Sequence, residues 1–141
     1  MATILNSKSY YYNDVNLIAQ PAAIKSRKEV PNELHRVIVS PMSAVISEKF
    51  AIEADKLGLT ICLHRFCKPF EEANILKKLK NNDRHFVCIG LDDDERIVIL
   101  QQSGASNWLI DTANGYLPQI SDVIDKLIQH GANKIMIGNI N

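Results

Sequence analysis

WLIDTANGY, the stretch from Trp108 to Tyr116, reads as a short buried strand that ends on an acid and continues into a glycine turn. Its first three residues are apolar, and so short an apolar run between turn residues predicts a strand rather than a helix. Asp111 follows at the carboxyl end of that strand. In parallel α/β proteins this end of a strand presents ligand-binding groups. Asp111 is therefore either a carboxylate that binds hydroxyl groups or a cap for the next element, and the stretch alone leaves both open.

Strand-like and helix-like segments alternate along the chain from residue 36 onward. Strands are expected at 36–40, 59–64, 84–89, 107–111 and 134–138, and helices at 47–57, 69–79, 93–102 and 118–130. The last helix is the clearest, because its apolar residues recur every three or four positions and Gly131 follows it. Four successive strand–helix units predict a parallel sheet.

The close and regular spacing of these units favours a (β/α)8 barrel over an open sheet, and no strand is followed by a GxGxxG loop. A closed barrel takes about 250 residues. The 141 residues are thus expected to form the N-terminal part of an incomplete TIM barrel, with about five strands and four helices. We treat residues 1–141 as one partial barrel domain. Val37, Ile61, Ile110 and Ile135 are expected to point into the barrel interior.

Composition is that of an ordinary globular domain, with 46% apolar and 23% charged residues. The 16 Lys and Arg balance 16 Asp and Glu, so no nucleic acid or anionic membrane partner is indicated. No apolar run approaches the roughly 20 residues that cross a bilayer. The N-terminus lacks the features of a signal peptide, and the three cysteines show no metal-ligand spacing. A cytoplasmic protein without a metal site is expected.

Five segments, in order, resemble motifs of the GMP reductase and IMP dehydrogenase family. They are NDVNLIAQP with KSRKEV at 13–30, VIVSPM at 37–42, CLHRF at 62–66, DTANGY at 111–116 and IMIGNI at 135–140. The corresponding family patterns are DDVLL or DDVLI with a following SR, a first barrel strand that ends at methionine, IMHRF, DxA(N/H)G(Y/H) and IAGNV. Each motif is weak alone, but the ordered set spans nearly the whole chain.

The resemblance implies a site for NADPH and a purine nucleotide at the carboxyl ends of the strands. The residues that map onto cofactor-binding positions are Ser26, Arg27, Arg65, Asp111, Thr112 and Ala113. Met42 and Asn139 map onto the substrate pocket. Without the resemblance, Arg65 is equally well a solvated surface arginine, His64 is a histidine satisfied at a strand end, and Ser26 and Arg27 are surface residues.

The sequence departs from the family pattern in two places. The chain has Ser43 where the family carries an acidic or amide side chain after the first strand. The family's catalytic cysteine lies in a GIGPGxxCxT loop after the sixth strand, which also binds potassium, and the sequence contains no such loop. None of Cys62, Cys67 and Cys88 lies in an equivalent loop, so we assign no catalytic residue. A potassium site is expected only in the half of the barrel that is not represented here.

The reductase branch fits better than the dehydrogenase branch. Dehydrogenases usually insert regulatory modules after the second helix, where this chain continues directly through 80–84 into the next strand, and they more often read DS(S/A)HG in place of DTANG. The favoured function is thus a cofactor-side fragment of an NADPH-dependent GMP reductase, which converts GMP to IMP. The alternatives are an IMP dehydrogenase-like fragment, a non-catalytic remnant that acts as a binding module, and an unrelated (β/α) enzyme.

Five strands of a barrel leave two open sheet edges, at 36–40 and 134–138. Unpaired backbone groups along such edges invite pairing with another chain. The chain is therefore expected to bind a complementary C-terminal half, to form a homo-oligomer, or to aggregate, rather than to persist as a stable monomer.

Overall fold

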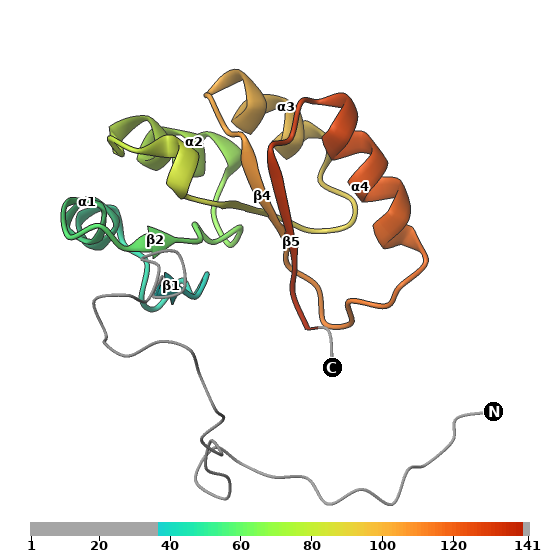
Figure 1. Cartoon of the computed structure of the whole chain (residues 1–141), viewed down its shortest axis with the longest axis horizontal. Helices are drawn as coiled ribbons and strands as arrows, with labels where there is room; N and C mark the ends of the chain where they lie inside the picture. The colour runs from blue at the N-terminus through green and yellow to red at the C-terminus, as the bar shows by residue number, and fades with distance from the viewer. Residues whose placement is uncertain (1–36, 140–141) are drawn as a thin grey trace, which may run out of the picture. The chain divides into compact units, whose positions relative to one another are not determined.

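The computed structural model describes residues 37–139, which fold as an alternation of five strands and four helices. The strands are β1 (Ile38–Val39), β2 (Thr60–Ile61), β3 (Val87–Ile89), β4 (Asn107–Ile110) and β5 (Lys134–Ile137). The helices are α1 (Glu48–Lys56), α2 (Pro69–Lys78), α3 (Asp94–Gln102) and α4 (Gln119–Gln129), and a 3-10 turn, η4, covers Asn82–Arg84. Figure 1 shows the four helices on one side of the strands.

Local sequence signals explain where the helices begin and end. Ser47 caps α1, since its hydroxyl oxygen accepts the amide of Phe50 at 3.2 Å. Pro69 opens α2, where a missing N–H costs nothing, and Glu71 reaches back to the Lys68 amide at 2.9 Å. Gly58 ends the turn after α1 with φ 82°, a conformation that residues with a Cβ rarely adopt. The predicted α/β class is confirmed, and the observed strands are shorter than expected.

All strand pairs are parallel and follow the order of the chain. β1 pairs with β2 in one sheet, and β3, β4 and β5 form a second sheet with β4 in its centre. Among the described residues, a single parallel bridge between Cys62 and Phe86 connects the two sheets. The five strands therefore succeed one another side by side, as in the wall of a (β/α) barrel. Closure into an eight-stranded barrel stays a prediction.

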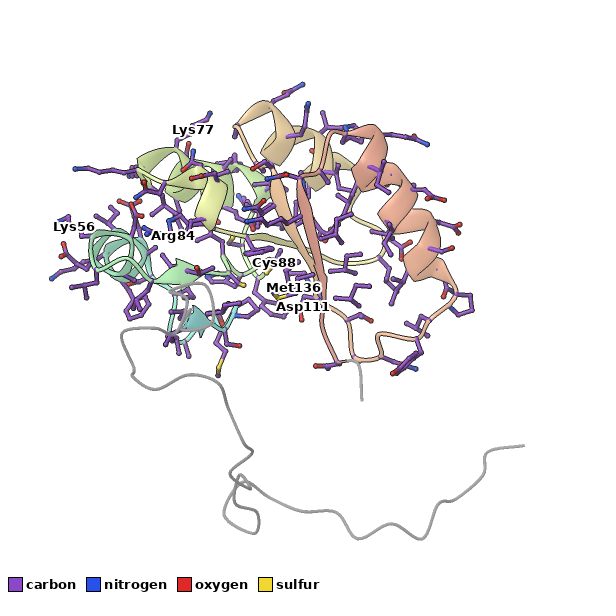
Figure 2. All side chains as sticks on the ribbon, viewed as in Figure 1. Lys56, Lys77, Arg84, Cys88, Asp111 and Met136 are labelled. Atoms are coloured by element: carbon purple, nitrogen blue, oxygen red, sulfur yellow. The ribbon has the colours of Figure 1, made fainter. Side chains whose placement is uncertain are left out.

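The main core lies between the strands and the four helices. Ile61, Trp108 and Ile110 pack there against buried residues of the helices, and all three are fully buried. The opposite face carries a smaller apolar cluster that no helix of the described chain covers. We call it the helix-free cluster: Cys62, Phe86, Cys88, Leu109 and the half-buried Met136. Figure 2 shows Cys88 and Met136 on the side of the strands away from α2 and α3.

The expected side-chain orientation of the strands was wrong. Ile61 and Ile110 belong to the core under the helices, Ile135 packs against that core, and Val37 is 61% exposed. The face of the strands away from the helices is formed instead by the alternate positions in the helix-free cluster. The cause is that both faces of these strands are apolar. Strand sequences such as WLI at 108–110 therefore show no alternation of apolar and polar residues from which the core-facing side could be predicted.

The hydrogen-bond ladder that connects the two sheets is short, and a side chain of α2 accepts the next backbone amide along β3. Phe86 makes two ladder hydrogen bonds with the end of β2 and the residues after it, its amide donating to Ile61 O at 2.9 Å and its carbonyl accepting from Leu63 N at 2.8 Å. The Cys88 amide, two residues further on, donates instead to Glu72 Oε1 at 2.9 Å. Glu72 of α2 thus satisfies the backbone where the strands diverge.

Within residues 37–139, no helix is long and apolar enough to cross a membrane.

Candidate functional site

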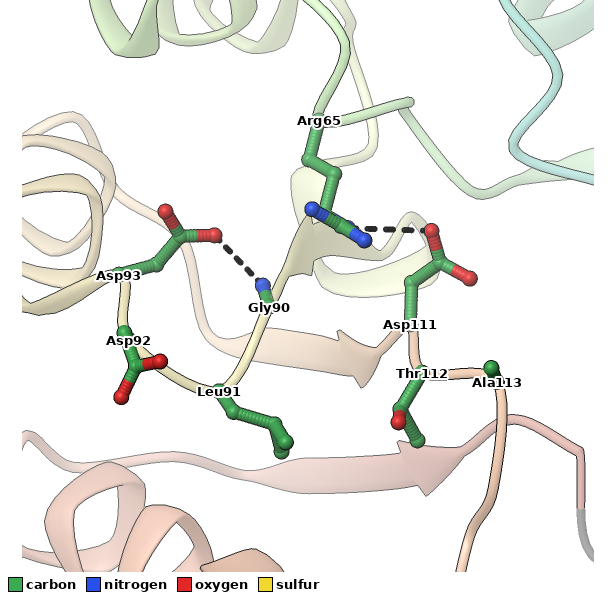
Figure 3. A pocket seen from close by; sticks show the side chains of 8 residues that line it. All are labelled: Arg65, Gly90, Leu91, Asp92, Asp93, Asp111, Thr112 and Ala113. Carbon is green, nitrogen blue, oxygen red and sulfur yellow. Dashed lines mark hydrogen bonds and ion pairs between the residues drawn. The ribbon is translucent and has the colours of Figure 1, made fainter.

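Two cavities adjoin at the carboxyl ends of the strands, and Asp111 lines both. The first, which we call the rim cavity, has a volume of about 350 Å³ and is lined by Arg65, Gly90, Leu91, Asp92, Asp93, Asp111, Thr112 and Ala113. Figure 3 shows these residues converging from the loops after β2, β3 and β4. The second, which we call the sheet cavity, has about 330 Å³ and is lined by Ile38, Ser40, Pro41, Cys62, Leu109, Asp111, Met136, Gly138 and Asn139.

The rim cavity is organised around an ion pair between Arg65 and Asp111. Arg65 Nε lies 3.2 Å from Asp111 Oδ2, and each side chain is about one-third exposed, at 33% and 30%. Asp111 is held by its own backbone, since its amide donates to Ile89 O at 2.8 Å. The pair uses Arg65 Nε and Asp111 Oδ2, so Asp111 Oδ1 and the two terminal nitrogens of Arg65 keep their capacity for further hydrogen bonds.

Gly90 provides the room for the Arg65 guanidinium. A Cβ at this position would lie 3.3 Å from Arg65 Nη1 and 3.2 Å from Asp93 Oδ2. Asp93 in turn accepts the Gly90 amide at 2.5 Å, as Figure 3 shows. Absence of a side chain at Gly90 therefore lets the arginine lie against the end of β3.

The loop after β4 has a defined shape. Asn114 Oδ1 accepts the Tyr116 amide at 3.0 Å, an Asx turn, and Thr112 Oγ1 lies 3.4 Å from the Asn114 amide. The Gly115 amide donates to Asn139 O at 3.0 Å. This last bond joins the DTANG segment to the end of β5, so two of the sequence motifs meet in space.

The structure brings most of the expected site residues together. Arg65, Asp111, Thr112 and Ala113 line the rim cavity, and Asn139 lines the sheet cavity. Met42 follows β1, is 54% exposed and lines neither cavity, although its neighbours Ser40 and Pro41 line the second. Ser26 and Arg27 lie outside the described residues. Their roles, like those of the others, stay predictions.

Sequence reasoning missed a buried ion pair beside the rim cavity. Arg96 of α3 donates through Nη1 to Glu72 Oε2, and the side chains are 8% and 0% exposed. Burial raises the pKa of the Glu72 carboxyl to about 7, against the opposing effects of the Cys88 amide and of Arg96. The only sequence signal for the pair is that both residues adjoin apolar stripes, Glu72 beside Ala73 and Arg96 beside Ile97.

The thiols are poorly suited to nucleophilic chemistry. Burial raises the pKa of Cys62 to about 12 and raises that of Cys88 still further above its usual value. Burial also raises the pKa of Cys67, which is half-buried after β2 and contacts the His64 carbonyl at 3.5 Å. A thiolate is the reactive form, so all three cysteines are disfavoured as nucleophiles. In the described part of the chain, no group of three or more His, Cys, Asp or Glu side chains is placed to hold a metal ion.

Comparison with known proteins confirms the resemblance to GMP reductases. The chain is 27% identical over 137 residues to a GMP reductase of Lactobacillus delbrueckii subsp. bulgaricus, covering 88% of this chain and 41% of that protein. It is 25% identical over 148 positions to the GMP reductase of Lactobacillus gasseri, covering 96% and 43%. Against the GMP reductase of Lacticaseibacillus casei it is 26% identical, covering 92% and 43%. The chain thus spans about two-fifths of the length of these relatives. No family model matches it.

Proposed function

We propose that the chain is the cofactor-side portion of a GMP reductase-like (β/α)8 barrel and that Asp111 joins its cofactor and purine sites. The observation that carries the proposal is the position of Asp111 between two adjoining cavities at the carboxyl ends of parallel strands. In barrel enzymes that end holds the active site. Two neighbouring cavities suit a reaction that brings two bound molecules together. Similarity to GMP reductases supports NADPH and a purine nucleotide as those molecules.

The rim cavity suits a hydroxyl-bearing part of the cofactor. Its lining contains three carboxylates, those of Asp92, Asp93 and Asp111, and one guanidinium, that of Arg65. A phosphate would meet an excess of negative charge there, whereas ribose hydroxyls donate well to a carboxylate. Asp111 Oδ1 is the acceptor we assign to the ribose. The resemblance implies that Ser26 and Arg27 also contact the cofactor, and a cationic side chain such as Arg27 suits its phosphates.

The sheet cavity suits a flat, partly apolar ring. Cys62, Leu109 and Met136 of the helix-free cluster line it, and Ser40 and Asn139 add polar groups at its margin. Sites for nucleobases commonly combine an apolar surface with a few polar groups that fix orientation. We assign the purine of GMP to this cavity.

In the proposed reaction, bound NADPH would supply a hydride to the purine, and ammonia would leave to give IMP. The residues of this chain would bind and orient the two molecules. A cysteine nucleophile in a GIGPGxxC loop is absent from the 141-residue sequence. Activity would therefore require that loop from a further segment or a second polypeptide.

Calorimetric titration with NADPH tests the proposal on the chain itself. Asp111→Ala should weaken binding by about 1.5 to 3 kcal/mol, the range for hydrogen bonds to charged groups. Asp125→Asn is the matched control, since Asp125 is an exposed carboxylate on α4 outside both cavities. Equal affinities of Asp111→Ala and Asp125→Asn would reject the assignment.

Reconstitution tests the proposed activity. The chain would be mixed with a polypeptide that carries the cysteine loop, and NADPH oxidation would be followed in the presence of GMP. Oxidation that requires both polypeptides and GMP is expected. Absence of oxidation, together with NADPH binding to the chain alone, would favour a binding module over a portion of an enzyme.

A further inference from the structure

The backbone of the β2–α2 loop, which carries Arg65, is hydrogen-bonded by the buried side chain of Arg96. Arg96 Nη2 donates to the carbonyl of Arg65 at 3.0 Å and to that of Cys67 at 2.6 Å. Its other terminal nitrogen donates to Glu72, and its Nε lies 3.8 Å from Asp93 Oδ2. One guanidinium therefore contacts α2, the residue just before α3, and the carbonyls on both sides of the loop residue Phe66.

Glu72 fixes Arg96 in turn. Its second carboxylate oxygen accepts the Cys88 amide at 2.9 Å, just before β3 ends at Ile89. Arg96 and Glu72 together thus connect the end of β3, whose next residue is Gly90, to the loop that carries Arg65. Gly90 and Arg65 are the two residues whose close approach shapes the rim cavity.

A buried ion pair is an inefficient way to stabilise a fold. Removing two charges from water is costly, and an apolar pair of similar volume is often as stable or more stable. The planar guanidinium instead offers a fixed fork that bonds a carboxylate and two carbonyls at once. Because the pair lies beside the rim cavity, its hydrogen bonds fix the position of the backbone around that cavity.

We propose that Arg96 is a positioning residue for the cofactor, which acts by holding the Arg65 backbone so that the Arg65 guanidinium reaches Asp111. This inference rests on the proposed function, because the consequence of positioning is measured as NADPH affinity. It assigns no contact between Arg96 and the cofactor, since Arg96 does not line either cavity.

Two variants separate positioning from folding. Arg96→Lys keeps a positive charge against Glu72, but an ammonium on a single stem does not reproduce the fork. The double variant Glu72→Met with Arg96→Met removes both charges and leaves no buried ion unpaired. Each is measured alone and combined with Arg65→Ala, which removes the side chain through which Arg96 is proposed to act.

The inference is tested by measuring the NADPH affinity of each of these variants alone and combined with Arg65→Ala. Arg65→Ala should weaken binding about tenfold, and Arg96→Lys should weaken it by a similar factor in the wild-type background. In the Arg65→Ala background, Arg96→Lys and the double Met variant should have no further effect, within about twofold. If the factors by which the variants weaken NADPH binding multiply, the inference is overturned. A general structural defect would lower the affinity whether or not Arg65 is present.

A second readout needs no ligand. The Arg65 Nε–H signal should be observable by NMR and protected from solvent exchange while it is bonded to Asp111, and Arg96→Lys should remove that protection. Protection that persists in Arg96→Lys overturns the inference even if wild-type chain binds no NADPH. Failure of wild-type chain to bind NADPH, with protection lost in Arg96→Lys, instead rejects the proposed function and leaves the Arg96–Arg65 relationship supported.

Discussion

His85 Nε2 lies 2.9 Å from Asp55 Oδ1, within a buried cluster at the amino ends of the strands. The other ring nitrogen, Nδ1, accepts the amide of Ile61 at 3.3 Å, so the ring is neutral and its proton is on Nε2. Asp55 also accepts the Lys80 amide at 2.8 Å and Arg84 Nη2 at 2.7 Å. This cluster connects α1 to the segment before β3, at the opposite end of the strands from Arg65 and Asp111. Arg84 and Asp111 are both labelled in Figure 2.

Asp55→Asn should destabilise the fold strongly. Burial raises the pKa of Asp55, but hydrogen bonds from the Lys80 amide, His85, Asn81 and Arg84 outweigh it and hold the pKa well below its usual range. Loss of the charge leaves these donors poorly compensated, and we expect a decrease of about 3 kcal/mol in the free energy of unfolding. Urea denaturation at pH 7 measures it. The exposed Asp125→Asn serves as control, and equal stability of the two variants would contradict the role given to Asp55.

His85 should make stability depend on pH below about 6.5. Burial lowers the pKa of His85 from its ordinary value of 6.5, and the hydrogen bond with Asp55 offsets this only in part. The unfolded chain then takes up a proton that the folded chain excludes, so the free energy of unfolding falls as pH decreases through 6.5. A decrease between pH 7.5 and 5.5 is expected from this residue, and it cannot exceed about 1.4 kcal/mol for each pH unit below 6.5.

His85→Gln isolates that contribution from other titrating groups, Glu72 among them. Its amide can still accept the Ile61 N–H and donate to Asp55, but it does not titrate. The difference in unfolding free energy between wild type and His85→Gln should change with pH by the same amount. A difference that stays constant from pH 7.5 to 5.5 would show that His85 does not bind protons differently on unfolding.

The order and type of the elements could be predicted from the sequence because each helix carries an apolar stripe and each strand is a separate apolar run. The faces of the strands could not, because Ile61 and Cys62, or Ile110 and Leu109, are both apolar and both buried. The lining of the rim cavity was predictable where one short segment supplies it, as Asp111 to Ala113 do, and the binding role of these residues stays a prediction. Glu72 and Arg96 were not, since the two residues are 24 positions apart and meet only through folding.

Gly90→Ala should separate Arg65 from Asp111 without disrupting the core. The added Cβ would lie 3.3 Å from Arg65 Nη1 and 3.2 Å from Asp93 Oδ2, so the guanidinium and the Asp93 carboxylate must each shift by a few tenths of an ångström. We expect NADPH to bind about five- to tenfold more weakly, in line with loss of one charged hydrogen bond. Titration in the Arg65→Ala background provides the check, because there the crowding against Arg65 is gone, only that against Asp93 remains, and Gly90→Ala should have a smaller effect. An equal loss of NADPH affinity in both backgrounds would mean that the methyl group itself obstructs the ligand.

Thiol labelling should distinguish Cys67 from the other two cysteines. Cys62 and Cys88 are fully buried in the helix-free cluster, whereas Cys67 is half-buried. One thiol should react with a disulfide reagent in the native chain, and three should react in denaturant. Cys67→Ser should abolish the native reaction. Labelling of more than one thiol under native conditions would show that the helix-free cluster is open to solvent on the timescale of the assay.

β5 is the strand at which the described sheet ends. β5 pairs with β4 on one side, and within residues 37–139 no strand pairs with its other side. Ile135, Met136 and Ile137 are only half-buried, and apolar edge strands promote association through their unpaired backbone groups. We therefore expect the chain to self-associate, or to bind a polypeptide that supplies further barrel strands.

Ile137→Pro should reduce this association, because proline removes a backbone donor and is tolerated chiefly on edge strands. The variant also loses an apolar contact with the main core, so Ile137→Ala is the matched control for that loss. Sedimentation velocity over a range of concentrations should show assembly for wild type and Ile137→Ala and a shift toward monomer for Ile137→Pro. A wild-type chain that sediments as a monomer at every concentration, with a sharp cooperative melt, would contradict the partial-barrel interpretation and favour a self-sufficient open α/β fold.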